Sequence, residues 1–310
     1  MRVWLRICER LHVGFFLATV GGLRFGKGMS YENLRLGALV VALVGVLGIP
    51  SAVAELPTLG EKKWLGHFIG FENKKFGYGF TVQGKSFIKV AGSDGEPLAR
   101  KLAVQVEFLV EEILPDGKPC VRQLLPESLE SLQPAGKEPK NVVIRGKVKG
   151  DTRFEISVDE HCGVISLGGR LLDKGPKGKN PVRFSIRMKF PNAYPYAKRS
   201  GDKKREEAFE EKIRNDRMSV TWTDGKRVKQ ATDQVIDAGS EGINGPGISA
   251  LQVEFSSYAG KKIGCVASVN SVMMLSGKQA GPLHDGFVLT WTADPVKDVN
   301  GLARLSFDVR

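Results

Sequence analysis

Two glutamates four residues apart are the first candidates for chemistry. Glu107 and Glu111 lie in a stretch where apolar and polar residues alternate, so both belong to one face of an expected strand. Paired carboxylates of this kind hydrolyse glycosidic bonds. Four residues at about 3.3 Å each place them ~13 Å apart along the strand, whereas hydrolysis needs a separation of about 5–9.5 Å. The pair alone does not predict a hydrolase, which would have to assemble its carboxylates from separate strands.

The histidines carry a weaker indication of chemistry. Residues 159–162 (DEHC) form an expected turn, and successive side chains of an extended chain point in alternate directions, which favours a polar turn over a metal site. His67, His161 and His284 are dispersed and lack the spacing of zinc ligands. The neighbour of His284, Asp285, is expected to point away from it. We expect no metal and no cofactor, and the sequence assigns no catalytic residue.

Common nucleotide and hydrolase motifs are missing from the sequence. Neither a nucleotide-binding loop nor the sharp turn of serine hydrolases occurs. The glycine-rich stretch 242–247 (GINGPG) lacks the Lys and Ser or Thr that a phosphate-binding loop needs. These classes of enzyme are therefore disfavoured.

The strongest indication of binding is a basic segment. The chain of 310 residues has a net charge of +12, and residues 173–229 alone hold 17 Lys or Arg against 8 Asp or Glu. Arg183 and Arg187 alternate with Phe184 and Ile186, so they should face outward if the apolar pair faces inward. The predicted contact surface consists of Arg183, Arg187, Lys189, Tyr194, Tyr196, Lys198 and Arg199.

An export signal changes which binding partner we expect for this surface. Residues 36–49 carry no charge, and Ala52-Val53-Ala54 then supplies the small-any-small pattern of signal-peptidase sites. Cleavage between Ala54 and Glu55 would leave a secreted or periplasmic chain. Translation is expected to start at Met29, which opens a short charged lead, and the alternative is a signal peptide with an unusually long lead. The expected partner is thus acidic polysaccharide or another envelope protein, and nucleic acid is not expected.

A membrane anchor is the alternative interpretation of the same apolar run. Stretched to Ala54, the run approaches the ~20 residues that span a bilayer. Pro50 and Ser51 make it a poor span, so the mature chain is expected to have no transmembrane segment.

Three cysteines follow the expected cleavage site, an odd number for an oxidising compartment. Cys265 lies in an apolar run and is expected to be an inert core residue. Cys120 and Cys162 are the predicted disulfide pair.

Strict alternation along most of the chain predicts an all-β fold. It recurs from Leu102 to Val110 and in five further segments, which is typical of antiparallel sheets with one face in the core. We expect an antiparallel β-sandwich, immunoglobulin-like or jelly-roll, either single or as two stacked sandwiches. Residues 126–139 are expected to be a polar loop. One solvated helix is expected near residues 202–216.

The helix suggests a division of the chain. We predict a β-sandwich over residues 55–190, a linker with the charged helix over 191–217, and a second sandwich over 218–310. A single large sandwich with an insertion is the alternative.

The sequence as a whole favours an exported, non-enzymatic protein that acts by binding. The alternative is a carbohydrate-active hydrolase with carboxylates from separate strands. It would show a concave sheet face with two carboxylates about 5–10 Å apart, near an exposed Trp222 or Trp291. A structural envelope component, recognised by exposed sheet edges, is a third class.

Overall fold

The computed structural model describes residues 56–175, 180–194, 203–233, 245–277 and 281–310. The predicted signal segment, with its start at Met29 and its cleavage site at Ala54 and Glu55, lies outside this range. Residues Val53–Arg310 form a compact unit by themselves. Among the described residues, no helix has the length and apolar character needed to cross a membrane.

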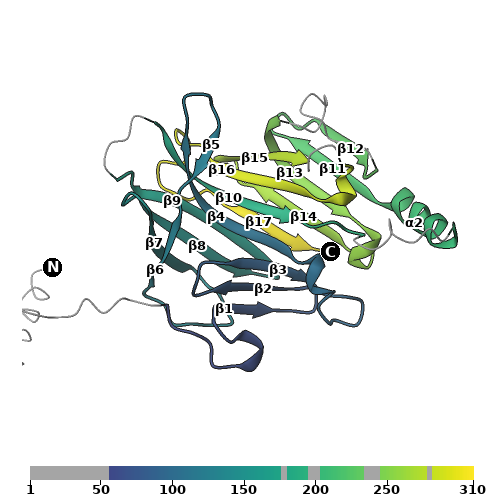
Figure 1. The fold of residues 1–310 in the computed structure, drawn as a ribbon, viewed down its shortest axis with the longest axis horizontal. Coiled ribbons are helices and arrows are strands. Elements are labelled where there is room, and N and C mark those ends of the chain that lie inside the picture. The colour runs from purple at the N-terminus through teal and green to yellow at the C-terminus, as the bar shows by residue number, and fades with distance from the viewer. Residues whose placement is uncertain (1–55, 176–179, 195–202, 234–244, 278–280) are drawn as a thin grey trace, which may run out of the picture. The chain divides into compact units, whose positions relative to one another are not determined.

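Strands make up most of the described chain (Figure 1). They are β1 (His67–Glu72), β2 (Phe76–Thr81), β3 (Ser86–Val90), β4 (Val104–Ile113), β5 (Pro119–Val121), β6 (Leu124–Ser131), β7 (Val142–Val148), β8 (Arg153–His161), β9 (Val164–Asp173), β10 (Val182–Phe190), β11 (Arg217–Trp222), β12 (Arg227–Ala231), β13 (Gly245–Glu254), β14 (Lys262–Ala267), β15 (Ser271–Gly277), β16 (Phe287–Ala293) and β17 (Leu305–Val309). The helices are η1 (Lys62–Trp64), η2 (Arg100–Leu102), α2 (Lys203–Asn215), η4 (Ser256–Tyr258) and η5 (Leu283–Asp285).

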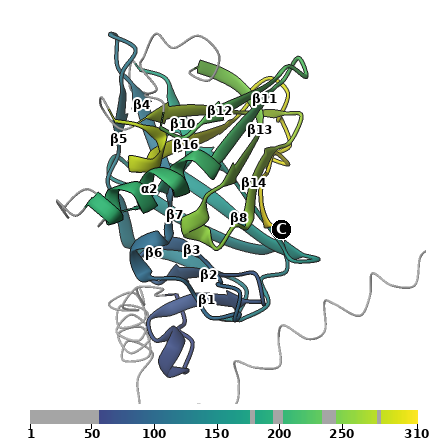
Figure 2. The same ribbon diagram turned by 90° about the vertical axis from the view of Figure 1, so that its right-hand side faces the viewer.

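The named strands pair antiparallel and form one large curled sheet (Figures 1 and 2). One run of neighbours is β1–β2–β3–β4–β10–β16–β15–β13. Another is β6–β7–β8–β9–β17–β14–β13–β11–β12. The all-β, antiparallel prediction is confirmed. The finer prediction of an immunoglobulin-like or jelly-roll sandwich is not confirmed, because the pairing continues through β13 from one run into the other.

Alternation positions the core as the sequence predicted. In β10, Phe184, Ile186 and Met188 are buried in the main apolar core. Arg183 and Arg187 lie on the opposite face of the strand and keep 42% and 25% of their side chains exposed. The predicted register of this strand is therefore confirmed.

Strands from the two predicted sandwiches pair directly with one another. β10 pairs with β16, and β9 pairs with β17. These pairs join segments that lie on opposite sides of residues 191–217 in the sequence. The division of the chain at this segment stays a prediction.

The predicted helix near residues 202–216 is present as α2. Most of its described side chains are exposed, while Ile213 is buried at 8% exposure. Phe209 is half-buried and packs edge-on against Tyr194, with ring centroids 5.4 Å apart. The solvated character that its charges predicted follows from this narrow apolar contact.

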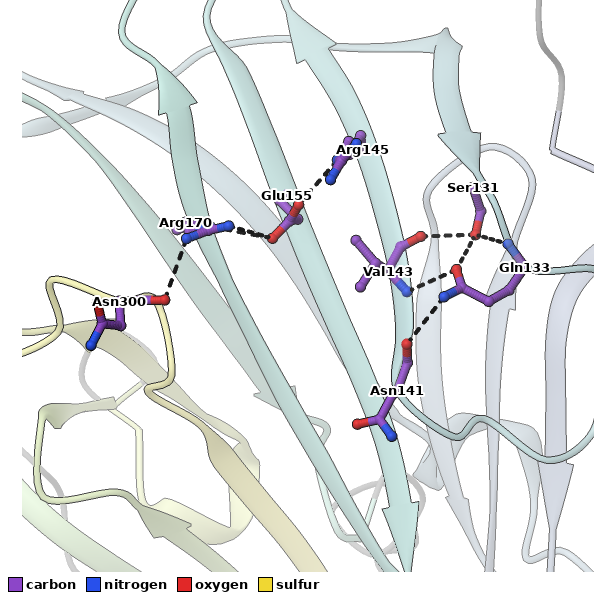
Figure 3. Close-up of polar contacts among 8 residues, drawn as sticks. All are labelled: Ser131, Gln133, Asn141, Val143, Arg145, Glu155, Arg170 and Asn300. Carbon is purple, nitrogen blue, oxygen red and sulfur yellow. Dashed lines mark hydrogen bonds and ion pairs between the residues drawn. The ribbon is translucent and has the colours of Figure 1, made fainter. Parts of the chain in front are cut away.

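The predicted polar loop at residues 126–139 is wrong in its first half, because β6 extends to Ser131. β6 pairs with β7, with a register shift between Leu125 and Glu130. The Ser131 hydroxyl donates to the carbonyl of Val143 at 2.8 Å, and the Gln133 amide oxygen accepts from the Val143 N–H at 3.3 Å (Figure 3). These side chains bind the backbone of β7 at the end of β6.

The predicted disulfide is not formed, since Cys120 and Cys162 are free and exposed. Cys120 lies on β5, and Nη1 of Arg122, the residue after this strand, donates to Thr152 Oγ1 at 2.5 Å, beside the start of β8. Cys162 follows the other end of β8, nine residues further on. Nine residues span about 30 Å, whereas bonded cysteines need Cα atoms within about 7 Å. Cys265 is buried, as expected, and burial raises the pKa of its thiol.

Candidate functional site

Small residues on β2 open a hollow on the face of the sheet opposite the core. Phe76, Tyr78 and Phe80 alternate into the core, so Gly77 and Gly79 face the other way. Without a side chain at Gly79, the Phe87 ring of β3 lies close against the sheet. A Cβ at Gly79 would lie 2.5 Å from Phe87 Cζ.

A prediction follows for these two glycines. Gly79→Ala should lower the free energy of unfolding by about 1–3 kcal/mol, because the new methyl group would push the Phe87 ring away. Gly77→Ala is the control, since its nearest atom would be at 3.4 Å, an ordinary contact. Urea unfolding of both variants measures the difference. Equal losses of unfolding free energy in the two variants would show that the close approach of Phe87 to the sheet does not contribute to stability.

A cleft of about 950 Å³ lies over this part of the sheet. Its lining includes Phe87 from β3, Gln105 and Glu107 from β4, and Lys189 from β10. The turn between β2 and β3, the helix η2 and the segment that follows β10 also contribute. A smaller hollow of about 400 Å³ adjoins it and shares His67, Phe87 and Lys89 with the cleft.

Glu107 is the carboxylate that the described residues bring into the cleft. Its side chain is 33% exposed. Lys189 Nζ donates to its Oε1 at 2.5 Å, and Arg187 Nη1 lies 3.9 Å from its Oε2. A solvent-accessible carboxylate beside a proton donor can exchange protons with a bound molecule.

Glu111 has a different environment, although it lies on the same strand. Only 1% of its side chain is exposed. Arg183 Nε donates to Oε2 at 3.0 Å and Arg187 Nη2 donates to Oε1 at 2.9 Å. Because both carboxylate oxygens are occupied, Glu111 holds β4 against β10 and does not offer an oxygen to a ligand.

The structure corrects the separation expected for the two glutamates. Arg187 contacts both glutamates, with Nη1 3.9 Å from Glu107 Oε2 and Nη2 2.9 Å from Glu111 Oε1. Because these two nitrogens belong to one planar guanidinium, the nearest oxygens of the two glutamates lie within about 9 Å of each other. The side chains lean toward a shared guanidinium, which the strand spacing of ~13 Å did not anticipate. The expected tryptophan is not beside them on this face, because Trp291 is fully buried in the core and Trp222 packs against it.

His67 belongs to the aromatic wall shared by the two hollows. Its ring lies edge-on to Trp64 and Phe87, with centroids 5.4 and 5.5 Å away. Nδ1 lies 3.1 Å from the carbonyl of Leu65, and because a carbonyl only accepts, Nδ1 carries the proton. Nε2 is enclosed and has no hydrogen-bond partner among the described residues. His67 therefore positions Phe87 and does not present a nitrogen to the cleft.

The other histidines do not join this site. His284 is buried at 5% exposure, with Nδ1 3.1 Å from the carbonyl of Thr232 and its ring against Phe209. His161 is exposed in the turn after β8. Among the described residues, no group of three or more His, Cys, Asp or Glu is placed to hold a metal ion. Beside His161, Glu160 Oε1 accepts from the Gly163 N–H at 2.7 Å and so stabilises the turn.

The predicted basic surface is divided by the structure. Arg183, Arg187 and Lys189 share a face, but they pair with Glu111 and Glu107 rather than standing free for an anion. The remaining described member, Tyr194, is half-buried and its hydroxyl donates to Asp216 Oδ2 at 2.6 Å. Burial, together with this hydrogen bond, raises the pKa of Tyr194. Tyr196, Lys198 and Arg199 lie outside the described residues.

A second carboxylate between two guanidiniums lies on β8 (Figure 3). Glu155 Oε2 accepts from Arg145 Nε at 3.0 Å, and Glu155 Oε1 accepts from Arg170 Nε at 3.2 Å. Arg170 Nη1 also donates to the carbonyl of Asn300 at 3.3 Å. These contacts tie β7, β8 and β9 to the loop before β17, which makes the cluster a structural one.

Comparison with known proteins adds distant similarities. No protein-family model matches the chain, and no curated protein matches its sequence. An Escherichia coli K12 protein with the provisional name aldose 1-epimerase matches with a TM-score of 0.45 at 10% identity, over 78% of this chain and 98% of its own. The Slr1438 protein of Synechocystis sp. PCC 6803 matches with a TM-score of 0.40 at 10% identity, over 77% and 94%. The α-N-acetylgalactosaminidase NagBb of Bifidobacterium bifidum matches with a TM-score of 0.43 at 10% identity, over 78% and 36%.

These comparisons correct the predicted function. The two neighbours that are named for an activity carry the names of carbohydrate enzymes. The prediction of a non-enzymatic binding protein is corrected to its carbohydrate-active alternative, which agrees better with these names. At 10% identity the likeness concerns the fold, so the chemistry of this chain has to be argued from its own residues.

Proposed function

We propose that the protein is a carbohydrate-active enzyme and that its substrate binds in the cleft above β3, β4 and β10. The observation that carries the proposal is Glu107, an exposed carboxylate on the floor of a cleft of about 950 Å³, in contact with Lys189. Gln83 and Gln105 line the same cleft and offer amide groups to sugar hydroxyls. Phe87 lines the same cleft and adds an apolar side chain beside these amide groups.

Proton transfer at the anomeric centre is the chemistry that this pair of groups supports best. Glu107 takes the proton of the anomeric hydroxyl, and the Lys189 ammonium gives a proton to the ring oxygen. The bond between the anomeric carbon and the ring oxygen then breaks, leaving an open-chain aldehyde. Ring closure on either face of the carbonyl returns both protons and gives both anomers.

Hydrolysis by two carboxylates receives less support from the geometry. Its nearest candidate for a second carboxylate is Glu111, which lies within about 9 Å of Glu107. Yet both oxygens of Glu111 accept from arginines and its side chain is 1% exposed. It can neither attack an anomeric carbon nor activate a water molecule in this state.

The test is to incubate the protein with a panel of sugars and to monitor the anomeric protons by NMR. Freshly dissolved single anomers of aldoses report interconversion, and oligosaccharides in the same panel report hydrolysis. The expected result is that the protein accelerates anomer interconversion of at least one aldose above the buffer rate. Release of a reducing end without faster interconversion would instead support hydrolysis. No change in any sugar would contradict the proposed function.

A further inference from the structure

The cleft carries an excess of positive charge. Among the described residues that line it are five Lys or Arg side chains and the single carboxylate of Glu107. Lys189 and Glu107 pair with each other, so their charges offset. The remaining cations line the cleft beside the proposed sugar, and they are Lys85, Lys89, Arg100 and Lys101.

Three of these cations have no carboxylate to neutralise them. Within the described part of the chain, Lys85, Lys89 and Arg100 form no ion pair. Surface lysines often lack a partner, but a cleft concentrates their field because its walls exclude solvent. An unpaired cluster of this kind favours a ligand with negative charge.

Lys89 has the most defined position of the three. Its Nζ lies 4.8 Å from the centroid of the Phe87 ring. The side chain is half-buried and lines both the cleft and the adjoining hollow. A cation held against an aromatic ring, at the junction of two hollows, is placed to bind one end of a ligand while the other end reaches into the cleft.

Strand register relates these cations to Glu107. Ser86 of β3 pairs with Val106 of β4. Lys85 immediately precedes β3 and therefore lies near the level of Glu107 on β4. Lys89 lies four residues from Lys85, about 13 Å along the extended chain. Lys89 and the proposed reacting group are therefore separated by a distance on the scale of one sugar with its substituent.

We propose that the substrate is a sugar that carries an oxyanion, either a phosphate ester or a carboxylate, bound by Lys89, while Lys85 and Arg100 add to the positive field of the cleft. The inference rests on the proposed sugar site and specifies its substrate class. The oxyanion binds at the Lys89 side of the cleft and directs the anomeric carbon toward Glu107. Neutral sugars occupy the same cleft with weaker affinity, because they leave the three cations without a counter-charge.

The experiment compares glucose, glucose 6-phosphate and glucuronate, which share one ring and differ in charge. Titration calorimetry at 50 mM and 300 mM salt measures their dissociation constants, with inorganic phosphate as a fourth ligand. At the lower salt concentration, we expect both anionic sugars to bind at least about tenfold more tightly than glucose. A higher salt concentration should reduce this difference in affinity between the anionic sugars and glucose. Lys89→Gln should remove about tenfold from the affinity for the anionic sugars and lower the affinity for glucose much less.

Lys226→Gln is the matched control, because this lysine lies in the exposed turn between β11 and β12, outside the cleft. Thermal unfolding of each variant establishes that it is folded. If glucose binds as tightly as the two anionic sugars, the inferred preference for an oxyanion is overturned, while the proposed sugar site is retained. If inorganic phosphate binds as tightly as glucose 6-phosphate, the site is an ion site without a sugar. If no sugar binds, the proposed function falls as well.

Discussion

Glu111→Gln should lower the free energy of unfolding by about 2–4 kcal/mol. The wild-type carboxylate is 1% exposed and accepts from Arg183 and Arg187 at 3.0 and 2.9 Å. Glutamine keeps the shape of the side chain but removes its charge, and its amide group would turn a donor toward one of two guanidiniums that can only donate. Urea unfolding at neutral pH, followed by tryptophan fluorescence, measures the loss.

Glu107→Gln is the matched control for stability, on the same strand and the same face. Its side chain is 33% exposed and pairs with Lys189, which is itself 40% exposed. An ion pair that water can screen contributes less than about 1 kcal/mol. If both variants lost the same stability, the distinction between a structural and a functional glutamate would be wrong.

Glu107→Gln should, in contrast, reduce the rate of sugar interconversion by about 10²–10⁴-fold. Glutamine occupies the same space but cannot accept and return a proton at neutral pH. The measurement is the rate of anomer interconversion by proton NMR, with the sugar that the wild-type protein turns over best. Affinity for the sugar should change much less than the rate, because the cleft keeps its shape.

Glu254→Gln is the control for this loss of activity. Glu254 pairs with Lys262 at 3.7 Å and lies on β13, outside the cleft. The variant has the same change of charge and should retain the wild-type rate. If Glu107→Gln were as active as Glu254→Gln, the proton transfer would have to be carried out by another group.

Alternation made the fold class predictable, and it also fixed which residues face the core. The period of two in β10 placed Phe184 and Ile186 inward and Arg183 outward, as observed. Strand pairing was harder, since β9 meets β17 across more than a hundred residues, and no local pattern encodes that contact. β6 escaped prediction because it lies at an edge and carries a proline and exposed polar residues.

The site was only partly predictable because its residues come together through pairing between strands. The sequence singled out Glu107 and Glu111, yet their roles depend on Arg187 of β10, 76 residues beyond Glu111. A local signal for the cleft did exist. The FGYGF pattern of β2 leaves Gly77 and Gly79 on the face opposite the core, which indicates a place where another group approaches the backbone. Phe87 and its neighbour Lys89 occupy that place.

The most direct test of the central claim is a crystal structure of the Glu107→Gln protein with a bound aldose. This variant should bind the sugar without turning it over. We expect a sugar in the cleft lined by Phe87 and Gln105, with its anomeric hydroxyl within hydrogen-bonding distance of residue 107 and of Lys189. A sugar bound elsewhere on the protein, with the cleft empty, would contradict the claim that this cleft is the catalytic site.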